Sequence, residues 1–171
     1  RKNLKDIARD FYRQALQRQS DRLDAACGML RTRASDGSST LALDVLELCS
    51  QLPTPFARLK VWLTLLKAAF MEGCPKEARA LKEKVYPEVL QGLTEGYRAF
   101  LENSEARSLI KLAKDLEADG EPEKAREIWR YAVTSPLTEL SQKASTELKR
   151  LDTYESTAVA APVSPTGEDD P

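Results

Sequence analysis

Histidine is absent from this 171-residue sequence, and there are only three cysteines. Without histidine, the chain lacks the commonest general base, the usual partner of a serine or cysteine nucleophile, and the commonest metal ligand. Cys27, Cys49 and Cys74 are too widely spaced for a disulfide framework or a zinc site, and we interpret them as small core residues, with Cys74 the most exposed. The sequence therefore predicts that the protein is not an enzyme and that it holds no metal and no cofactor.

No charge of one sign dominates, because 26 Lys and Arg residues are balanced by 27 Asp and Glu residues. The net charge of −1 gives no general attraction to nucleic acid, so no nucleic-acid partner is expected. No apolar run is long enough to cross a bilayer, so no membrane insertion is expected. The sequence begins without Met, which favours a processed product or an excised fragment. The compartment stays open, with the cytoplasm favoured.

A pattern of small residues is present three times. Each copy has a glycine, an alanine five residues later, a small residue twelve residues later, and a proline shortly after it. A turn between two helices needs a residue that tolerates positive φ, and helix axes approach closely only over small side chains. The pattern therefore predicts stacked helical hairpins. The copies are Gly37, Ala42, Cys49 and Pro53; Gly73, Ala78, Val85 and Pro87; and Gly120, Ala125, Ala132 and Pro136.

Apolar residues at helical spacing predict helices through most of the chain. An amphipathic, basic helix over 3–19 is expected to cap one end of the stack, and a helix over 136–151 to shield the other. The segment 56–72 is apolar around more than one stripe, so we expect it at the centre with neighbours on two sides. Residues 153–171 contain three prolines, acidic residues and no Lys or Arg, and are predicted to form a disordered tail.

The predicted fold is all-α, with about nine helices in a right-handed stack of antiparallel hairpins. Ser104 is expected to cap a helix, and Pro87 either ends a helix or kinks a longer one. The turn glycines are 36 and then 47 residues apart, so the spacing of the repeats is irregular. The hairpins are expected near 20–52, 56–86 and 104–134, with an extra helix near 88–102.

The last two hairpins share seven residue pairs at one offset, and both tryptophans stand at core positions. The pairs are Trp62/Leu109, Leu65/Leu112, Lys67/Lys114, Gly73/Gly120, Pro75/Pro122, Ala78/Ala125 and Arg79/Arg126. The alternative is that any two helical hairpins share alternating Leu and Ala around a glycine turn.

The third hairpin resembles a tetratricopeptide repeat. The residues that carry the resemblance are Leu109, Leu112, Ala113, Leu116, Gly120, Ala125, Trp129 and Ala132. The second hairpin is less similar, because Lys82 stands where that family has an aromatic residue. The resemblance implies a tetratricopeptide-like α-solenoid. Half-repeat relatives in RNA-processing assemblies, and helical repeats with longer periods, remain alternatives within the same class.

In tetratricopeptide proteins, the first helices of the hairpins line a groove that binds peptides. Arg31, Lys67 and Lys114 each lie six residues before a turn glycine, at a position that faces the groove in that family. The resemblance implies a ladder of cations for a carboxylate-rich or C-terminal partner segment, with Leu63 and Phe70 as an apolar floor. The alternative is that these cations are merely solvated. The asparagines that clamp a terminal carboxylate in some family members are absent from these positions.

Two functions are compatible with these patterns. The first is a protein–protein interaction module, an adaptor, scaffold or assembly factor, that binds a partner peptide or helix in the groove. An acidic segment would suit the predicted cations. The second is a helical regulatory or linker domain excised from a larger enzyme or RNA-associated assembly. The oligomeric state is left open.

Overall fold

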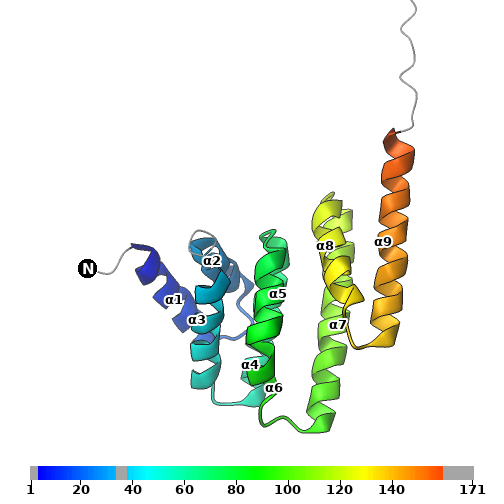
Figure 1. Cartoon of the computed structure of the whole chain (residues 1–171). Helices are drawn as coiled ribbons and strands as arrows, with labels where there is room; N and C mark the ends of the chain where they lie inside the picture. The colour runs from blue at the N-terminus through cyan, green and yellow to red at the C-terminus, as the bar shows by residue number, and fades with distance from the viewer. Residues whose placement is uncertain (1–3, 34–37, 160–171) are drawn as a thin grey trace, which may run out of the picture.

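The computed structural model describes residues 4–33 and 38–159, and these form nine α-helices and no strand (Figure 1). The predicted all-α class is confirmed. In chain order the helices are α1 (Leu4–Arg18), α2 (Leu23–Arg33), α3 (Ser38–Gln51), α4 (Pro55–Met71), α5 (Pro75–Lys84), α6 (Tyr86–Leu90), α7 (Glu95–Ala118), α8 (Pro122–Val133) and α9 (Thr138–Val159).

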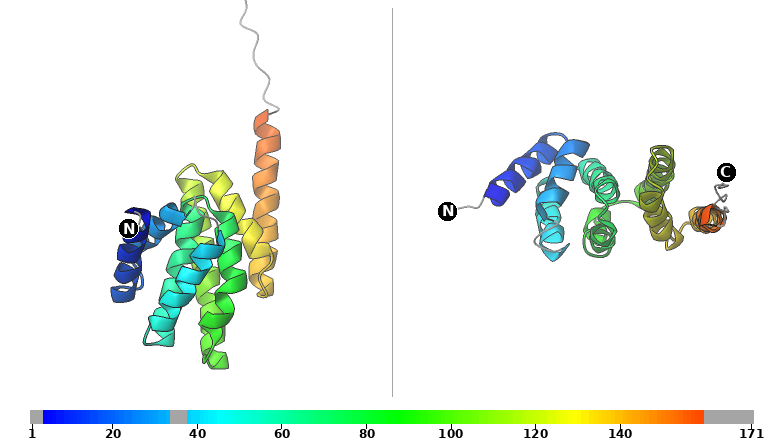
Figure 2. Two further views of the ribbon diagram at one scale, coloured as in Figure 1. Left: turned by 60° about the vertical axis from the view of Figure 1, so that its left-hand side comes forward. Right: turned by 90° about the horizontal axis from the view of Figure 1, so that it is seen from above.

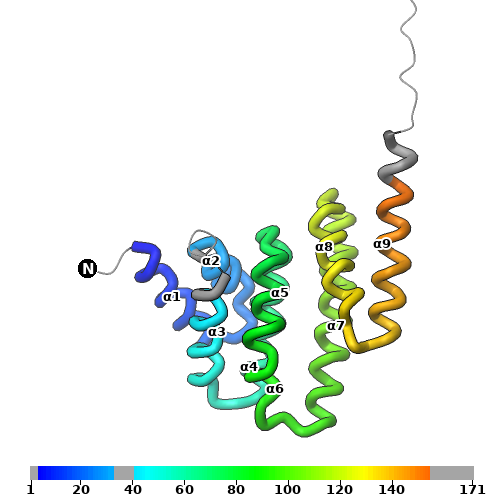
Figure 3. The backbone as a smooth tube through the Cα atoms, in the orientation of Figure 1, coloured from blue at the N-terminus to red at the C-terminus, as the bar shows by residue number. Residues whose placement is uncertain are grey.

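The helices lie side by side in an extended row, which the view from above shows as two layers over most of its length (Figure 2). Helices α2, α4 and α7 contact one another in succession in one layer, and α3, α5 and α8 do so in the other. The pairs α2/α3, α4/α5 and α7/α8 are also in contact. Helix α1 packs on α2 and α3 at one end of the row, and α9 packs on α8 at the other (Figure 3).

The turns of the last two hairpins have the same backbone conformation. Gly73 and Gly120 have φ values of 68° and 78°, in the left-handed region that favours glycine. In each turn, the residue after the glycine donates its N–H to the carbonyl five residues earlier. The distance is 2.7 Å from Cys74 to Ala69 and 2.8 Å from Glu121 to Leu116. The first copy of the pattern has its glycine, Gly37, outside the described residues.

The residues that flank these two glycines match as well. Glu72 and Asp119 have φ/ψ values of −80°/1° and −79°/1°. Cys74 and Glu121 have −111°/62° and −112°/59°. Each turn is followed by a proline in the first turn of the next helix, where no hydrogen bond is lost by its missing N–H. The sequence offset of 47 between the turns is therefore an offset between equivalent structures.

We expect Gly73→Ala and Gly120→Ala each to lower the free energy of unfolding by about 1–2 kcal/mol, because an L side chain is strained at positive φ. A Cβ at Gly120 would meet no atom within 4 Å, so the loss there reports backbone strain alone. Gly96→Ala is the matched control, because Gly96 lies within α7 and a Cβ there is equally unobstructed. It should leave stability unchanged or raise it. Urea titration measures all three, and equal losses for Gly96→Ala and Gly120→Ala would contradict the strain argument.

The buried apolar side chains form a continuous core through both layers of the described helices, and both tryptophans are fully buried within it. Helix α4 is the most enclosed, because it contacts α2, α5, α6, α7 and α8. The predicted central position of the segment 56–72 is therefore confirmed. Thr64 is buried on this helix and donates its hydroxyl to the carbonyl oxygen of Lys60 at 2.7 Å, which satisfies its polar group within the helix.

The predicted boundary at Ser104 is wrong, and so is the extra helix near 88–102. The chain instead forms the one-turn helix α6, turns at Gly92 with φ of 73°, and then forms the single helix α7. Asn103 and Ser104 carry short polar side chains that suit a helix cap but do not force one, whereas Gly92 supplies a turn conformation that ends helices. Pro87 follows the end of α5, which is the first of its two predicted roles, because α5 ends at Lys84 with Val85 as its C-cap and Pro87 lies in the first turn of α6.

The last helix is longer than the sequence suggests. Helix α9 runs to Val159, eight residues beyond the predicted end of the shielding helix at 151. Residues 153–159, which were predicted to belong to the disordered tail, are therefore helical. Nothing in this stretch breaks a helix, because the first proline of the tail is Pro162. The remainder of the predicted tail, 160–171, lies outside the described residues.

Candidate functional site

Helix α4 reaches solvent along one narrow stripe. Between Leu59 and Phe70, only Lys60, Leu63 and Lys67 are not buried. These three residues are spaced i, i+3 and i+7, so they lie on one face of the helix. A helix that is otherwise enclosed therefore presents a half-buried aliphatic side chain between two cations.

Helix α7 carries the same arrangement at the offset of 47 residues. Arg107 and Lys114 are exposed and Ile110 is half-buried between them. Because α4 and α7 are neighbours in one layer and lead into equivalent turns, their equivalent faces belong to the same side of that layer. We call these two sets of residues, Lys60, Leu63 and Lys67 on α4 and Arg107, Ile110 and Lys114 on α7, the basic stripes.

Most cations of the basic stripes are not neutralised within the molecule. Lys60 lies 3.8 Å from Asp21 and also over the ring of Phe56, 5.2 Å from its centroid. Among the described residues, no carboxylate forms an ion pair with Lys67, Arg107 or Lys114. An anionic group of another molecule could therefore pair with these cations without displacing a carboxylate of the described residues.

A groove continues the basic stripe of α7 toward α9, and its volume is about 590 Å³. Its lining includes the half-buried aliphatic side chains of Ile110 and Leu137 and the exposed cations Arg107 from α7 and Lys143 from α9. Glu139 is an acidic residue of the same lining. Such a groove can hold an aliphatic or aromatic side chain whose neighbours along a peptide are acidic.

Arg31, the first member of the predicted ladder, is already engaged. Its Nε and Nη2 each donate a hydrogen bond of 2.7 Å to the carboxylate of Glu72, just after α4. This bidentate pairing lowers the pKa of Glu72 and raises that of Arg31, because each charge stabilises the other. Arg31 therefore fastens α2 to the end of α4, and its charge is neutralised there.

Phe70 does not form an apolar floor for a ligand, and that prediction is wrong. Its side chain is 1% exposed and meets Tyr131 edge-on, with ring centroids 5.4 Å apart and planes at 77°. Position 70 lies seven residues after Leu63 and so on nearly the same face of α4, but α8 covers this end of the helix, and the Phe70 ring is enclosed there against Tyr131. Leu63, Lys67 and Lys114 do lie on the basic stripes. The sequence prediction missed Lys60, Arg107 and Ile110, although the offset of 47 could have found them.

Glu105 is a buried carboxylate on α7, the kind of group that general acid–base chemistry uses. It accepts hydrogen bonds from Trp62 Nε1 at 3.1 Å, from Lys82 Nζ at 2.9 and 3.1 Å, and from Tyr131 OH at 3.4 Å. Burial and the nearby Glu105 charge raise the pKa values of Tyr131 and Tyr86. The donors come from α4, α5 and α8 and occupy the carboxylate, so Glu105 ties four helices together.

The cysteines are small core residues, as predicted. Cys27 and Cys49 are buried free thiols, and burial raises the pKa of each to about 11. Cys74 is half-buried, and burial raises its pKa as well. All three thiols are therefore protonated at neutral pH, the form that is a poor nucleophile.

Comparison of the chain with protein-family models, with curated proteins and with solved structures finds no match. None of the helices in 4–33 and 38–159 combines the length and the hydropathy that a bilayer-spanning segment needs.

Proposed function

We propose that the protein is a protein–protein interaction module, a tetratricopeptide-like adaptor, scaffold or assembly factor, that binds an acidic peptide or helix along the basic stripes. The observation that carries the proposal is the repetition of one surface pattern, a cation, an aliphatic residue and a cation, on two neighbouring helices. The proposal is supported by the absence, among the described residues, of a carboxylate partner for Lys67, Arg107 or Lys114. A partner that supplied carboxylates would gain charge-assisted hydrogen bonds without breaking existing ones.

The groove between α7 and α9 adds a place for an apolar anchor. Interfaces combine a few buried anchors with a polar rim, and this groove is lined by both aliphatic residues, Ile110 and Leu137, and cations, Arg107 and Lys143. The preferred ligand is therefore a segment in which an aliphatic or aromatic residue is flanked by Asp or Glu. Contacts to Leu63 would extend the same arrangement onto α4.

Reversing two cations tests this proposal. Lys67→Glu combined with Lys114→Glu should weaken capture of a specific partner from a lysate by about 100-fold, because each charge-assisted hydrogen bond contributes about 1.5–3 kcal/mol. The matched control is Lys76→Glu with Lys84→Glu, which reverses two exposed cations of α5 in the opposite layer. Circular dichroism should show unchanged helicity for both proteins, because all four side chains lie outside the core.

The outcomes separate the possible functions. Capture that survives the reversal on α4 and α7 would reject the basic stripes as the binding surface. A domain that only positions other parts of a larger assembly, which is the alternative function, would capture nothing by itself. Retention that is lost on nuclease treatment and falls steeply with salt would indicate a nucleic-acid ligand instead.

A further inference from the structure

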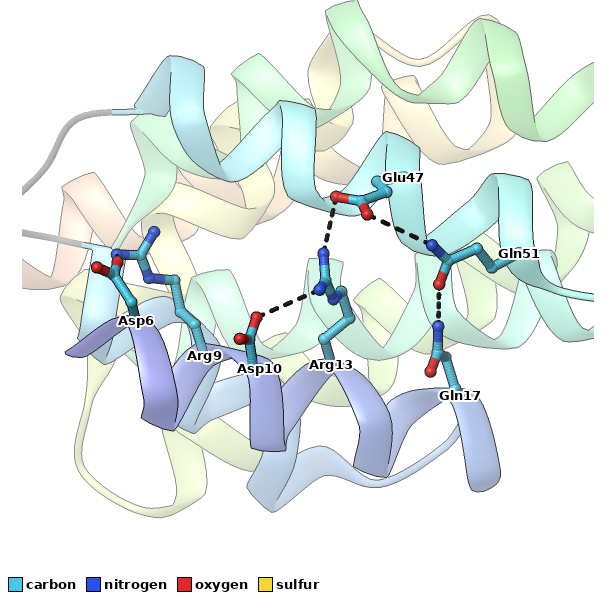
Figure 4. Close-up of polar contacts among 7 residues, drawn as sticks. All are labelled: Asp6, Arg9, Asp10, Arg13, Gln17, Glu47 and Gln51. Carbon is cyan, nitrogen blue, oxygen red and sulfur yellow. Dashed lines mark hydrogen bonds and ion pairs between the residues drawn. The ribbon is translucent and has the colours of Figure 1, made fainter. Parts of the chain in front are cut away.

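Helix α1 is attached to the rest of the molecule partly through its polar face. Arg13 Nη1 donates to Glu47 of α3 at 2.7 Å, and Gln17 donates to Gln51 one turn further along both helices (Figure 4). Arg13 also donates to Asp10 of its own helix at 3.2 Å. Figure 4 shows Arg13 and Gln17 reaching from α1 to Glu47 and Gln51 of α3, so this part of the polar face makes contacts inside the molecule.

Two larger side chains fix α1 on α2. The ring of Tyr12 lies so close over Gly28 that a Cβ at that glycine would come within 2.4 Å of the ring. Leu16 is fully buried beside it in the core. Together with the contacts to α3, this packing determines the rotation of α1 about its axis, and so it determines which residues of α1 point away from the molecule.

The residues that point away are apolar. Leu4, Ile7 and Phe11 are spaced i, i+3 and i+7, and their exposed fractions are 82%, 41% and 66%. Gln14 and Arg18 continue the same line and are also exposed. We call these five residues the outer stripe. The end helix of a helical stack normally presents a polar outer face, so an apolar one marks a surface for a further element.

We propose that the outer stripe docks an amphipathic helix of a partner protein that carries Asp or Glu beside its own apolar stripe. The spacing of Leu4, Ile7 and Phe11 is that of one seam of a coiled coil, which another helix complements by the same spacing. Arg18 lies at the end of this seam, and Lys5 is exposed next to Leu4. An acidic residue on the incoming helix meets the cation at Arg18.

A second copy of the chain is a poorer occupant. Two parallel α1 helices in register would bring Arg18 against Arg18. Two antiparallel α1 helices, centred on Phe11, would bring Arg18 against Leu4. Each arrangement leaves a cation at the seam without a counter-ion, which is unfavourable as the seam loses water.

An anionic lipid surface is also a poorer occupant. Helices that lie in the membrane interface use the cations of their polar face to contact phosphate groups. In α1, Arg9 is paired with Asp6, and Arg13 is paired with Asp10 and Glu47. Both arginines are therefore already neutralised, Arg9 within α1 and Arg13 within α1 and by α3 (Figure 4).

The test uses the full chain and two fluorescent, lactam-bridged helical peptides. Both peptides have Leu at the seam positions, and one has Glu and the other Lys at the flanking positions. We expect the Glu peptide to bind at least about 10-fold more tightly in an anisotropy titration. Ile7→Glu with Phe11→Glu should weaken its binding at least about 10-fold, because the burial of these two apolar side chains no longer contributes to the binding free energy. Arg18→Glu should shift the preference toward the Lys peptide.

Two control variants test whether the loss of peptide binding is specific to the outer stripe. Tyr97→Glu changes an exposed aromatic residue of α7, far from α1 along the chain, and should leave peptide binding unchanged. Lys67→Glu with Lys114→Glu should also leave peptide binding unchanged, so the proposals for the outer stripe and for the basic stripes are tested independently. Circular dichroism should be the same for every variant, because the changed side chains lie outside the core.

Three results would overturn the proposal. Equal affinity of the wild type and the Ile7→Glu, Phe11→Glu variant for the Glu peptide would exclude the outer stripe. A dimer in sedimentation velocity that Phe11→Glu abolishes would show that a second copy covers it. Binding to vesicles of phosphatidylserine and phosphatidylcholine that Phe11→Glu abolishes, without binding of the Glu peptide, would assign the stripe to lipid.

Discussion

Glu105→Ala is expected to lower the free energy of unfolding by about 2–4 kcal/mol, because it leaves two buried hydrogen-bond donors and the part-buried Lys82 ammonium without their acceptor. The substitution removes the acceptor for the Trp62 indole N–H, the Lys82 ammonium and the Tyr131 hydroxyl. These donors come from three helices, and Trp62 and Tyr131 would stay buried without their partner, whereas Lys82 is part-exposed. Guanidinium titration followed by circular dichroism measures the change.

Glu105→Gln separates charge from shape. The amide oxygen can still accept a hydrogen bond from Trp62, but the charge pairing with the Lys82 ammonium is lost. We therefore expect Glu105→Gln to lower the free energy of unfolding by less than Glu105→Ala does. Asp115→Ala changes an exposed carboxylate of the same helix and should cost less than about 0.5 kcal/mol. A loss below about 1 kcal/mol for Glu105→Ala would show that the cluster does not hold the four helices together.

Phe70→Ala is expected to destabilise the protein by about 3–5 kcal/mol, the usual range for a phenylalanine removed from a core. The ring is buried between α4 and α8 and packs edge-on against Tyr131. Its loss would leave a cavity next to Glu105, which accepts a hydrogen bond from the same tyrosine. Thermal or urea unfolding of the purified variant measures the effect without any partner.

The matched control for Phe70→Ala is Leu63→Ala on the solvent-facing stripe of the same helix. Leu63 is only half-buried, so we expect a loss of about 1 kcal/mol or less. The two residues therefore have different roles, one in the core and one at the surface, whereas the sequence hypothesis placed both in one apolar floor. Similar losses for the two variants would contradict the assignment of Phe70 to the core and Leu63 to the surface.

The hairpin turns could be read from the sequence because their requirements are local. Gly73 and Gly120 must adopt positive φ, and the prolines at Pro75 and Pro122 begin the next helices with a fixed φ. Residues a few positions apart impose both conditions, so a short pattern is enough. The same reasoning failed at Ser104, since a residue that can cap a helix can equally lie inside one, and no glycine or proline decides between them there.

The candidate surface was predictable only in part. Lys67 and Lys114 were selected because a fixed distance from the turn glycine sets which face of a helix a residue occupies, and neither of them is buried in the structure. Phe70 was misplaced because the sequence does not show that α8 covers that side of α4. Arg31 was misjudged because Glu72, which neutralises it, lies 41 residues away and meets it only through packing of α2 on α4.

The sequence by itself determined the all-α class, the positions of the described hairpin turns and most helix boundaries, because hydrophobic periodicity and backbone sterics act over a few residues. Only the tertiary structure decided which faces remain free. The apolar side of α1 gives the clearest example. The helix is amphipathic and caps the stack, yet Tyr12, Leu16 and Arg13 hold it so that Leu4, Ile7 and Phe11 face outward. That choice depends on contacts between segments far apart in the chain, which no local pattern records.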